Sequence, residues 1–164
     1  MSQIMIVIGG FVLLSMLSLH VNNTILAKAD EAYASQNVIV ATTLAQGLIQ
    51  EISLKDFDEK TTGGFTADSV GALTLPANLG KDGVETFATY DDIDDYKSYT
   101  RFDTVRNGVF KSRVDVYYVN GSTLNYSAVQ TYYKKVSVST TDTASSGALK
   151  KMTVPITLIN IYSY

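Results

Sequence analysis

Four aspartates lie close together near the middle of the chain, at Asp91, Asp92, Asp94 and Asp95. Closely spaced carboxylate oxygens are the ligands that Ca²⁺ prefers, and backbone carbonyls often complete its coordination. The segment lacks the fixed Gly and the terminal Glu of an EF-hand loop, so it is not that motif. It predicts either a calcium site of another kind or a solvated acidic turn in which the aspartates cap short helices.

The rest of the sequence offers little for catalysis. Its 164 residues include no Cys and a single His, His20, which lies in an apolar stretch. These counts exclude a disulfide framework, a thiolate metal site, a Ser-His-Asp triad and a multi-His zinc site. Adjacent acids in one loop do not resemble the opposed carboxylates of a glycosidase, and no glycine-rich phosphate motif is present. With a net charge of −3, the chain also has no basic field for nucleic acid. We therefore expect neither enzymatic activity nor a nucleic-acid partner.

Three asparagines begin formal N-glycosylation sequons, Asn22-Asn-Thr, Asn120-Gly-Ser and Asn125-Tyr-Ser, and the last two are the candidates. The pattern is short, and a chain rich in Asn, Ser and Thr matches it easily by chance. Asn120 and Asn125 are therefore weak candidates for glycosylation.

The first 27 residues contain no Asp, Glu, Lys or Arg. About 20 apolar residues in a helix suffice to cross a hydrocarbon core about 30 Å thick. Residues 1–27 therefore predict an apolar helix that lies in a membrane at one time and in a shared helix core at another. The residues expected to pack in that core are Ile4, Met5, Ile8, Phe11, Val12, Leu14 and Leu17.

The N-terminal end lacks the basic residues that normally precede such a segment. The sequence Met1-Ser2-Gln3 carries only the terminal amine, and the first basic side chain is Lys28. We expect that a basic leader has been removed and that Met1 is a mature terminus. The alternative is a native N-terminus inserted with its short end outside.

The helical pattern continues past the apolar segment. Apolar residues recur three and four positions apart, as on one face of a helix, at Val38, Ala41, Leu44, Ala45, Leu48 and Ile52. Gly63 and Gly64 then break the period, and Gly is the usual helix terminator. The sequence predicts that residues 28–59 continue the same rod and that it ends near residues 55–59.

Residues 60–164 predict a globular head. A loop-rich segment at 63–100 precedes three strands, expected at 109–119, 125–139 and 152–162. Asn120-Gly121 is a hairpin signal, and Pro155 places the last strand at a sheet edge or next to a bulge. The predicted fold class is α+β, with a small antiparallel meander packed on the helix beyond about residue 28.

This arrangement of a long helix, a loop-rich segment and an antiparallel meander resembles the type IV pilin superfamily. Residues 41–52 and 55–59 look like the helix end of minor pilins and type II secretion pseudopilins. Residues 90–96 resemble the acidic loop of some minor pilins, including those of mannose-sensitive haemagglutinin pili. The sequence departs from the family at Met5, where type IV pilins usually carry a Glu that pairs with a neighbour's terminal amine.

The resemblance implies a non-enzymatic structural subunit of an extracellular, type IV pilus-like filament. Its implied partners are copies of itself or related pilins, an assembly platform and a prepilin peptidase, with the inner membrane as its location before assembly. One alternative is a minor pseudopilin of a type II secretion system. The other is a single-pass membrane protein whose extracytoplasmic head binds a ligand or calcium. Calcium is the only cofactor that the residues suggest.

Overall fold

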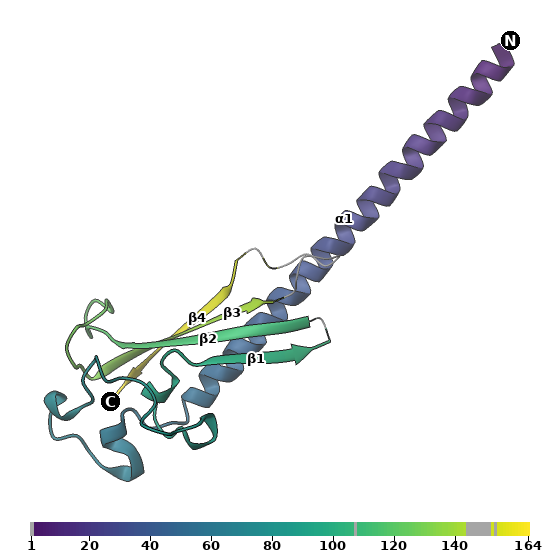
Figure 1. Cartoon of the computed structure of the whole chain (residues 1–164). Helices are drawn as coiled ribbons and strands as arrows, with labels where there is room; N and C mark the ends of the chain where they lie inside the picture. Colours follow the sequence, from purple (N-terminus) through teal and green to yellow (C-terminus); the bar gives the residue numbers. More distant parts are fainter. Residues whose placement is uncertain (1, 107, 144–151, 153) are drawn as a thin grey trace.

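The structure, a computed structural model, describes residues 2–106, 108–143, 152 and 154–164. It begins with one long helix, α1 (Ser2–Ile52), which carries the head at its C-terminal end (Figure 1). With a rise of 1.5 Å per residue, its 51 residues give a rod about 77 Å long. The N-terminus therefore lies far from the head.

Only the C-terminal part of α1 packs against the head. Its buried side chains are Asn37, Ala41, Ala45, Leu48 and Ile52, spaced three or four residues apart. This spacing places them on one face of the helix. By contrast, side chains 3–33 are all exposed. The predicted continuous rod is confirmed, and its contact with the head begins at Asn37.

The helix ends at Ile52, so the predicted end near residues 55–59 is wrong by a few residues. The N–H groups of residues 54 and 55 donate to carbonyls three residues back, which tightens the last turn. Asp56 then pairs with the acidic segment. Its N–H donates to the Asp91 carbonyl, and its own carbonyl accepts from the Ile93 N–H. These contacts occupy the backbone groups that a longer helix would use.

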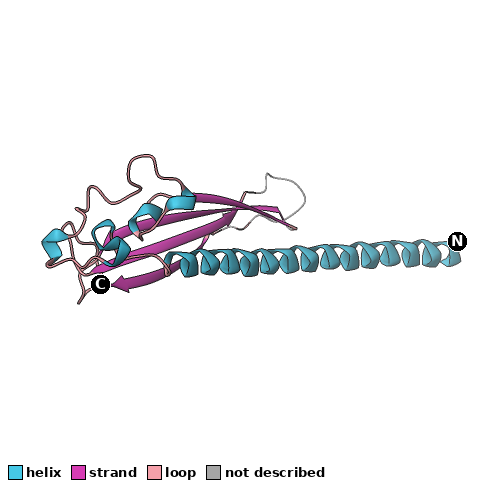
Figure 2. Cartoon of the chain, turned by 90° about the horizontal axis from the view of Figure 1, so that it is seen from below, coloured by secondary structure: helices cyan, strands magenta, loops and turns pink. Residues whose placement is uncertain are grey.

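Four antiparallel strands form one sheet in the order β1-β2-β3-β4. Their bounds are β1 (Thr100–Val105), β2 (Gly108–Tyr118), β3 (Tyr133–Asp142) and β4 (Ile156–Ser163). The register pairs Val114 with Val138 and Val116 with Val136, and all four are buried. Figure 2 shows the sheet lying along the C-terminal part of α1 as a second layer. The predicted α+β fold class is therefore confirmed.

The structure corrects the strand bounds. β1 was not predicted from the sequence, because its six residues follow the loop-rich segment and include only two apolar side chains, Phe102 and Val105. The strand predicted at 125–139 begins only at Tyr133. Before it, the Leu124 N–H donates to the Asn120 carbonyl in a turn of the connection between β2 and β3. The last strand begins directly after Pro155 and lies at the sheet edge, as predicted.

The segment between α1 and β1 is the predicted long loop. It contains four short 3₁₀ helices, η1 (Glu59–Gly64), η2 (Val70–Ala72), η3 (Phe87–Thr89) and η4 (Asp94–Tyr96). Aromatic rings of Phe87, Tyr90, Tyr96 and Tyr99 pack together in it, with centroids 5.0 to 6.3 Å apart. Tyr90 and Tyr96 also belong to the main hydrophobic core. This packing holds the acidic segment against the head.

Candidate functional site

The N-terminal half of α1 is an extended apolar surface. The seven residues expected to pack against other helices are all exposed, from 49% for Val12 to 76% for Met5. Runs such as Ile4 to Ile8 place apolar side chains on every face of the helix. A helix that is apolar all round needs lipid or other helices to cover it. By length and composition, α1 can span a membrane.

Exposed apolar side chains continue along α1 beyond this apolar segment. An exposed Lys28–Glu31 ion pair marks where charged residues begin. Beyond it, Tyr33, Val38 and Ile39 are 45%, 42% and 66% exposed. Since a bilayer about 30 Å thick is already spanned by the first 20 or so residues, these side chains lie outside what an anchor needs.

The four aspartates of the acidic segment point in different directions. Asp91 is exposed, whereas Asp92, Asp94 and Asp95 are buried. Asp92 Oδ1 accepts from the Asp95 N–H at 3.0 Å, and Asp95 Oδ2 accepts from the Asp91 N–H at 3.1 Å. The segment is thus an acidic turn whose carboxylates satisfy local backbone groups. Three of its carboxylates are buried rather than solvated.

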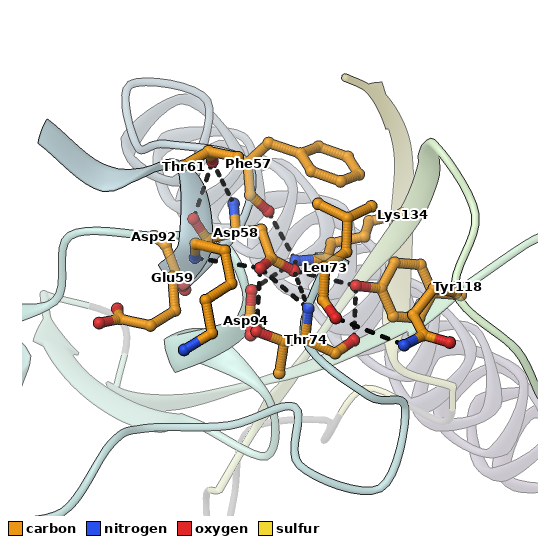
Figure 3. Close-up of polar contacts among 12 residues, drawn as sticks. Phe57, Asp58, Glu59, Thr61, Leu73, Thr74, Asp92, Asp94, Tyr118 and Lys134 are labelled. Carbon is orange, nitrogen blue, oxygen red and sulfur yellow. Dashed lines mark hydrogen bonds and ion pairs between the residues drawn. The ribbon is translucent and has the colours of Figure 1, made fainter. Parts of the chain in front are cut away.

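Asp94 meets a buried lysine. The Lys134 ammonium donates to Asp94 Oδ1 at 2.5 Å, to Asp58 Oδ2 at 2.9 Å and to the Phe57 carbonyl at 2.6 Å (Figure 3). The side chains of Lys134 and Asp58 are both 0% exposed. The nitrogen also lies 4.7 Å from the Phe57 ring centroid and 5.3 Å from that of Tyr118. We refer to Asp58, Asp94, Tyr118 and Lys134 as the buried charge cluster.

Asp58 is the most heavily bonded member of this cluster. It is the N-cap of η1 and accepts from the Lys60 N–H. The Thr74 N–H and hydroxyl and the Tyr118 hydroxyl also donate to its carboxylate. With Lys134, this one side chain joins η1, the rest of the long loop, β2 and β3. Buried carboxylates require such partners, because an unpaired buried charge is strongly destabilising.

The pKa values follow burial and the position of the ammonium. Burial raises the pKa of Asp58, but the Lys134 charge and the donors outweigh it, so that pKa lies below its ordinary value. Burial raises the pKa of Asp94, with Lys134 opposing the rise. Burial and the neighbouring Asp94 raise the pKa of Asp92 to about 9, and burial raises that of Asp95 to about 7.

These shifts predict a pH-dependent stability. The ordinary pKa of Asp92 is 3.8 and its folded pKa is about 9, so the folded state holds an extra proton between these values. The free energy of unfolding should therefore fall as pH rises through this window, by up to about 1.4 kcal/mol per pH unit. The folded pKa of Asp58 lies below its ordinary value, so Asp58 has the opposite effect on stability. Its contribution to the free energy of unfolding is lost only as pH falls below that ordinary value.

The variant Asp92→Asn tests this prediction. An amide keeps an oxygen for the Asp95 N–H and carries no titrating proton, so the profile should flatten and stability near pH 8 should rise. Thermal melts of the full chain in detergent with EDTA, from about pH 5 to about pH 9, measure it. An equally steep profile in the variant would show that Asp92 is not responsible.

A different group of carboxylates converges beside the acidic segment. Oxygens of Glu85, Asp91 and Asp95 all lie within 4.8 Å of one another. The structure thus brings together two of the four predicted calcium ligands and adds Glu85. Asp94 is paired with Lys134, and one oxygen of Asp92 is bonded to backbone. Carboxylates at this spacing suit Ca²⁺, so the calcium site stays a prediction with an altered ligand set.

If calcium binds there, millimolar Ca²⁺ should raise the melting temperature of the full chain relative to EDTA, because binding to the folded state alone stabilises it. Asp91→Asn should abolish the shift at little cost in stability, since Asp91 is exposed. Asp68→Asn, at another exposed aspartate of the long loop, should leave the shift unchanged. Equal melting temperatures with Ca²⁺ and with EDTA would show that these carboxylates do not bind calcium.

Asn120 and Asn125 are exposed in the connection between β2 and β3. Asn120 Oδ1 accepts from the N–H groups of Ser122 and Thr123, which forms the turn around it. Glycosylation at Asn120 or Asn125 stays a prediction.

The buried charge cluster was not identified from the sequence. One signal was present, because Lys134 occupies the same inward strand register as Val136 and Val138. A lysine among buried valines must find a buried partner. Its partners Asp58 and Asp94 carry no such signal, since nothing in a loop sequence shows which carboxylate turns inward.

Comparison of the chain with protein-family models, with curated proteins and with solved structures found no match.

Proposed function

We propose that this chain is a structural subunit of an extracellular, type IV pilus-like filament and that it polymerises through α1. One observation carries the proposal. The apolar half of α1 projects from the head with every side chain from Gln3 onward exposed, and it continues into the packed half without a break. Such a rod can lie in the inner membrane before assembly and in a bundle of identical helices afterwards.

The move of the apolar half of α1 from the membrane to a helix bundle need not cost much free energy. Apolar side chains gain about 25 cal/mol per Å² when they are covered instead of facing water. Lipid and a helix bundle both supply that cover, so leaving the membrane exposes little apolar surface to water if the helices bundle at once. The head, with its polar loops, then forms the filament surface. The implied helpers are an assembly platform and a prepilin peptidase.

Two alternatives compete with this proposal. A minor pseudopilin of a type II secretion system would share the same architecture and form a short periplasmic structure. A single-pass membrane protein would use α1 only as an anchor and bind a ligand or calcium through the head. The exposed Tyr33, Val38 and Ile39 beyond the apolar segment favour lateral helix packing over a simple anchor.

Sheared surface fibres from the source cell test the proposal. The chain should be an abundant component of these fibres by mass spectrometry. A trace amount beside another abundant pilin would make it a minor subunit, and cells without any fibre would favour the pseudopilin. An uncleaved, monomeric chain in detergent would favour the membrane anchor.

Met5 bears on how such a filament would pack. Its side chain is 76% exposed, and no carboxylate lies in the first 27 residues. Type IV pilins usually form a pair between a Glu at this position and a neighbour's terminal amine. Met5 cannot form that pair. Packing of apolar side chains would have to set the register between subunits.

A further inference from the structure

Lys134 Nζ is in direct contact with the Asp94 carboxylate inside the head. We propose that Lys134 and Asp94 join in an intramolecular isopeptide bond between the side-chain nitrogen and the Asp94 carboxyl carbon. The proposal concerns the head alone and does not depend on the filament function. Three observations support it: the contact between the reacting groups, the exclusion of water and the presence of a second carboxylate.

The reacting groups are in contact and shielded. Lys134 Nζ lies 2.5 Å from Asp94 Oδ1, with 0% and 3% of the two side chains exposed. Attack requires the nitrogen to be held beside the carboxyl group, and this contact keeps Lys134 Nζ next to it. The Phe57 and Tyr118 rings lie against the same nitrogen and keep solvent away. A water-poor site favours condensation, because water is the product.

Asp94 is the better electrophile of the two carboxylates. Asp58 is held as an ionised carboxylate by Lys60, Thr74 and Tyr118 as well as by Lys134. A carboxylate stabilised in this way resists attack at its carbon. Asp94 Oδ1 has the ammonium as its donor, so proton transfer across that hydrogen bond yields a neutral amine and a neutral carboxylic acid.

Asp58 can then serve as the proton carrier. The amine nitrogen attacks the Asp94 carboxyl carbon, and its surplus proton passes to Asp58 Oδ2, 2.9 Å away. Asp58 returns this proton to the departing hydroxyl, so the C–O bond breaks and one water leaves. One ammonium and one carboxylate become one amide and one water, with no oxidant or other reactant. Asp58 ends as it began.

Such a bond would cross-link segments that no disulfide can join in a chain without Cys. It would tie η4 to β3, residues 40 positions apart in sequence. A cross-link of this kind restricts the unfolded chain, as a disulfide does.

Intact-mass spectrometry of the full chain under denaturing conditions tests the proposal. The chain should be lighter than its sequence by one water, and Lys134→Met should restore the full mass. Lys135→Met is the matched control, because the adjacent lysine lies over Tyr117 outside the cluster and should leave the water loss intact. Dehydration at Asp82-Gly83 would also remove a water, but it would persist in Lys134→Met and would overturn the assignment.

Peptide mapping identifies the bond even if Lys134→Met does not fold. Trypsin should leave residue 134 uncut and yield a branched peptide joining residues 82–97 to residues 114–135. Asp94→Asn should yield the same branched product by loss of ammonia, whereas Asp58→Asn should yield none. A branch to residues 56–60 would move the bond to Asp58 and overturn the choice of Asp94. A mass equal to that of the sequence, with separate linear peptides, would show that Lys134 and Asp94 form only an ion pair and would overturn the proposal.

Discussion

Replacing Leu14 by Asp should abolish filament formation. Leu14 is 63% exposed on a segment that has apolar neighbours on every face, such as Phe11 and Leu17. In a helix bundle or in lipid, its position would be dry, and an unpaired carboxylate there costs several kcal/mol. Because every subunit adds the same charge, the penalty repeats along the filament. Electron microscopy and the yield of sheared fibres measure the effect.

Two controls separate assembly from folding. Leu14→Ile keeps the volume and the apolar surface, so fibres should form. A chain beginning at Lys28 should fold and stay in solution without detergent, because the first buried side chain of α1 is Asn37. Fibres of normal abundance from the Leu14→Asp chain would contradict helix bundling as the mechanism of assembly.

Removing the Asp58 carboxylate should cause the largest loss of stability in the head. Asp58→Ala leaves the Lys134 ammonium with Asp94 as its one carboxylate partner, and it leaves the Thr74 N–H and hydroxyl without their acceptor. Breaking a buried ion pair by removing one partner costs about 3–5 kcal/mol. Domains have only about 5–15 kcal/mol of stability, so this change should bring the head close to unfolding.

Urea unfolding of the full chain in detergent, followed by circular dichroism, measures this loss. Asp115→Ala is the matched control, because Asp115 pairs with Arg113 at 3.5 Å on the exposed sheet surface. Exposed pairs of this kind contribute about 0–1 kcal/mol. Similar unfolding curves for the two variants would mean that Asp58 does not hold the loop, η1 and the sheet together.

The two largest expected effects thus lie in different parts of the molecule. In the proposed filament, the apolar residues 3–27 of α1 would act between chains, and all of their side chains are exposed. The buried charge cluster acts within one chain and fixes the loops at the end of the sheet that lies near Ile52. A variant of one part should leave the other unchanged, which makes the two predictions independent of each other.

The α-helix and most of the sheet could be predicted from the sequence because their signals are local. A run of apolar residues and a spacing of three and four positions require only neighbours along the chain. The alternation of apolar and polar residues at 109–119 is also a local signal. The strand that it predicts is confirmed as β2 (Gly108–Tyr118). The absence of Cys and the single His likewise limited the chemistry without any structure.

The partners of the side chains in the acidic segment could not be predicted from local sequence. Four aspartates predict oxygen ligands, but the sequence does not show that Asp94 turns towards Lys134 while Asp91 stays exposed beside Glu85. β1 was missed for a related reason, since its short pattern is stabilised by pairing with β2 rather than by its own residues. In both cases the deciding partner lies elsewhere in the chain.

The sequence by itself therefore determined the long helix, the antiparallel meander and the absence of any site that needs a thiol. What only the tertiary structure decided is which charges are buried together. Asp58, Asp94 and Lys134 come from three segments, and a buried carboxylate is stable only where folding delivers a cation and donors to it. That condition depends on distances between segments, and those distances exist only after the chain has folded.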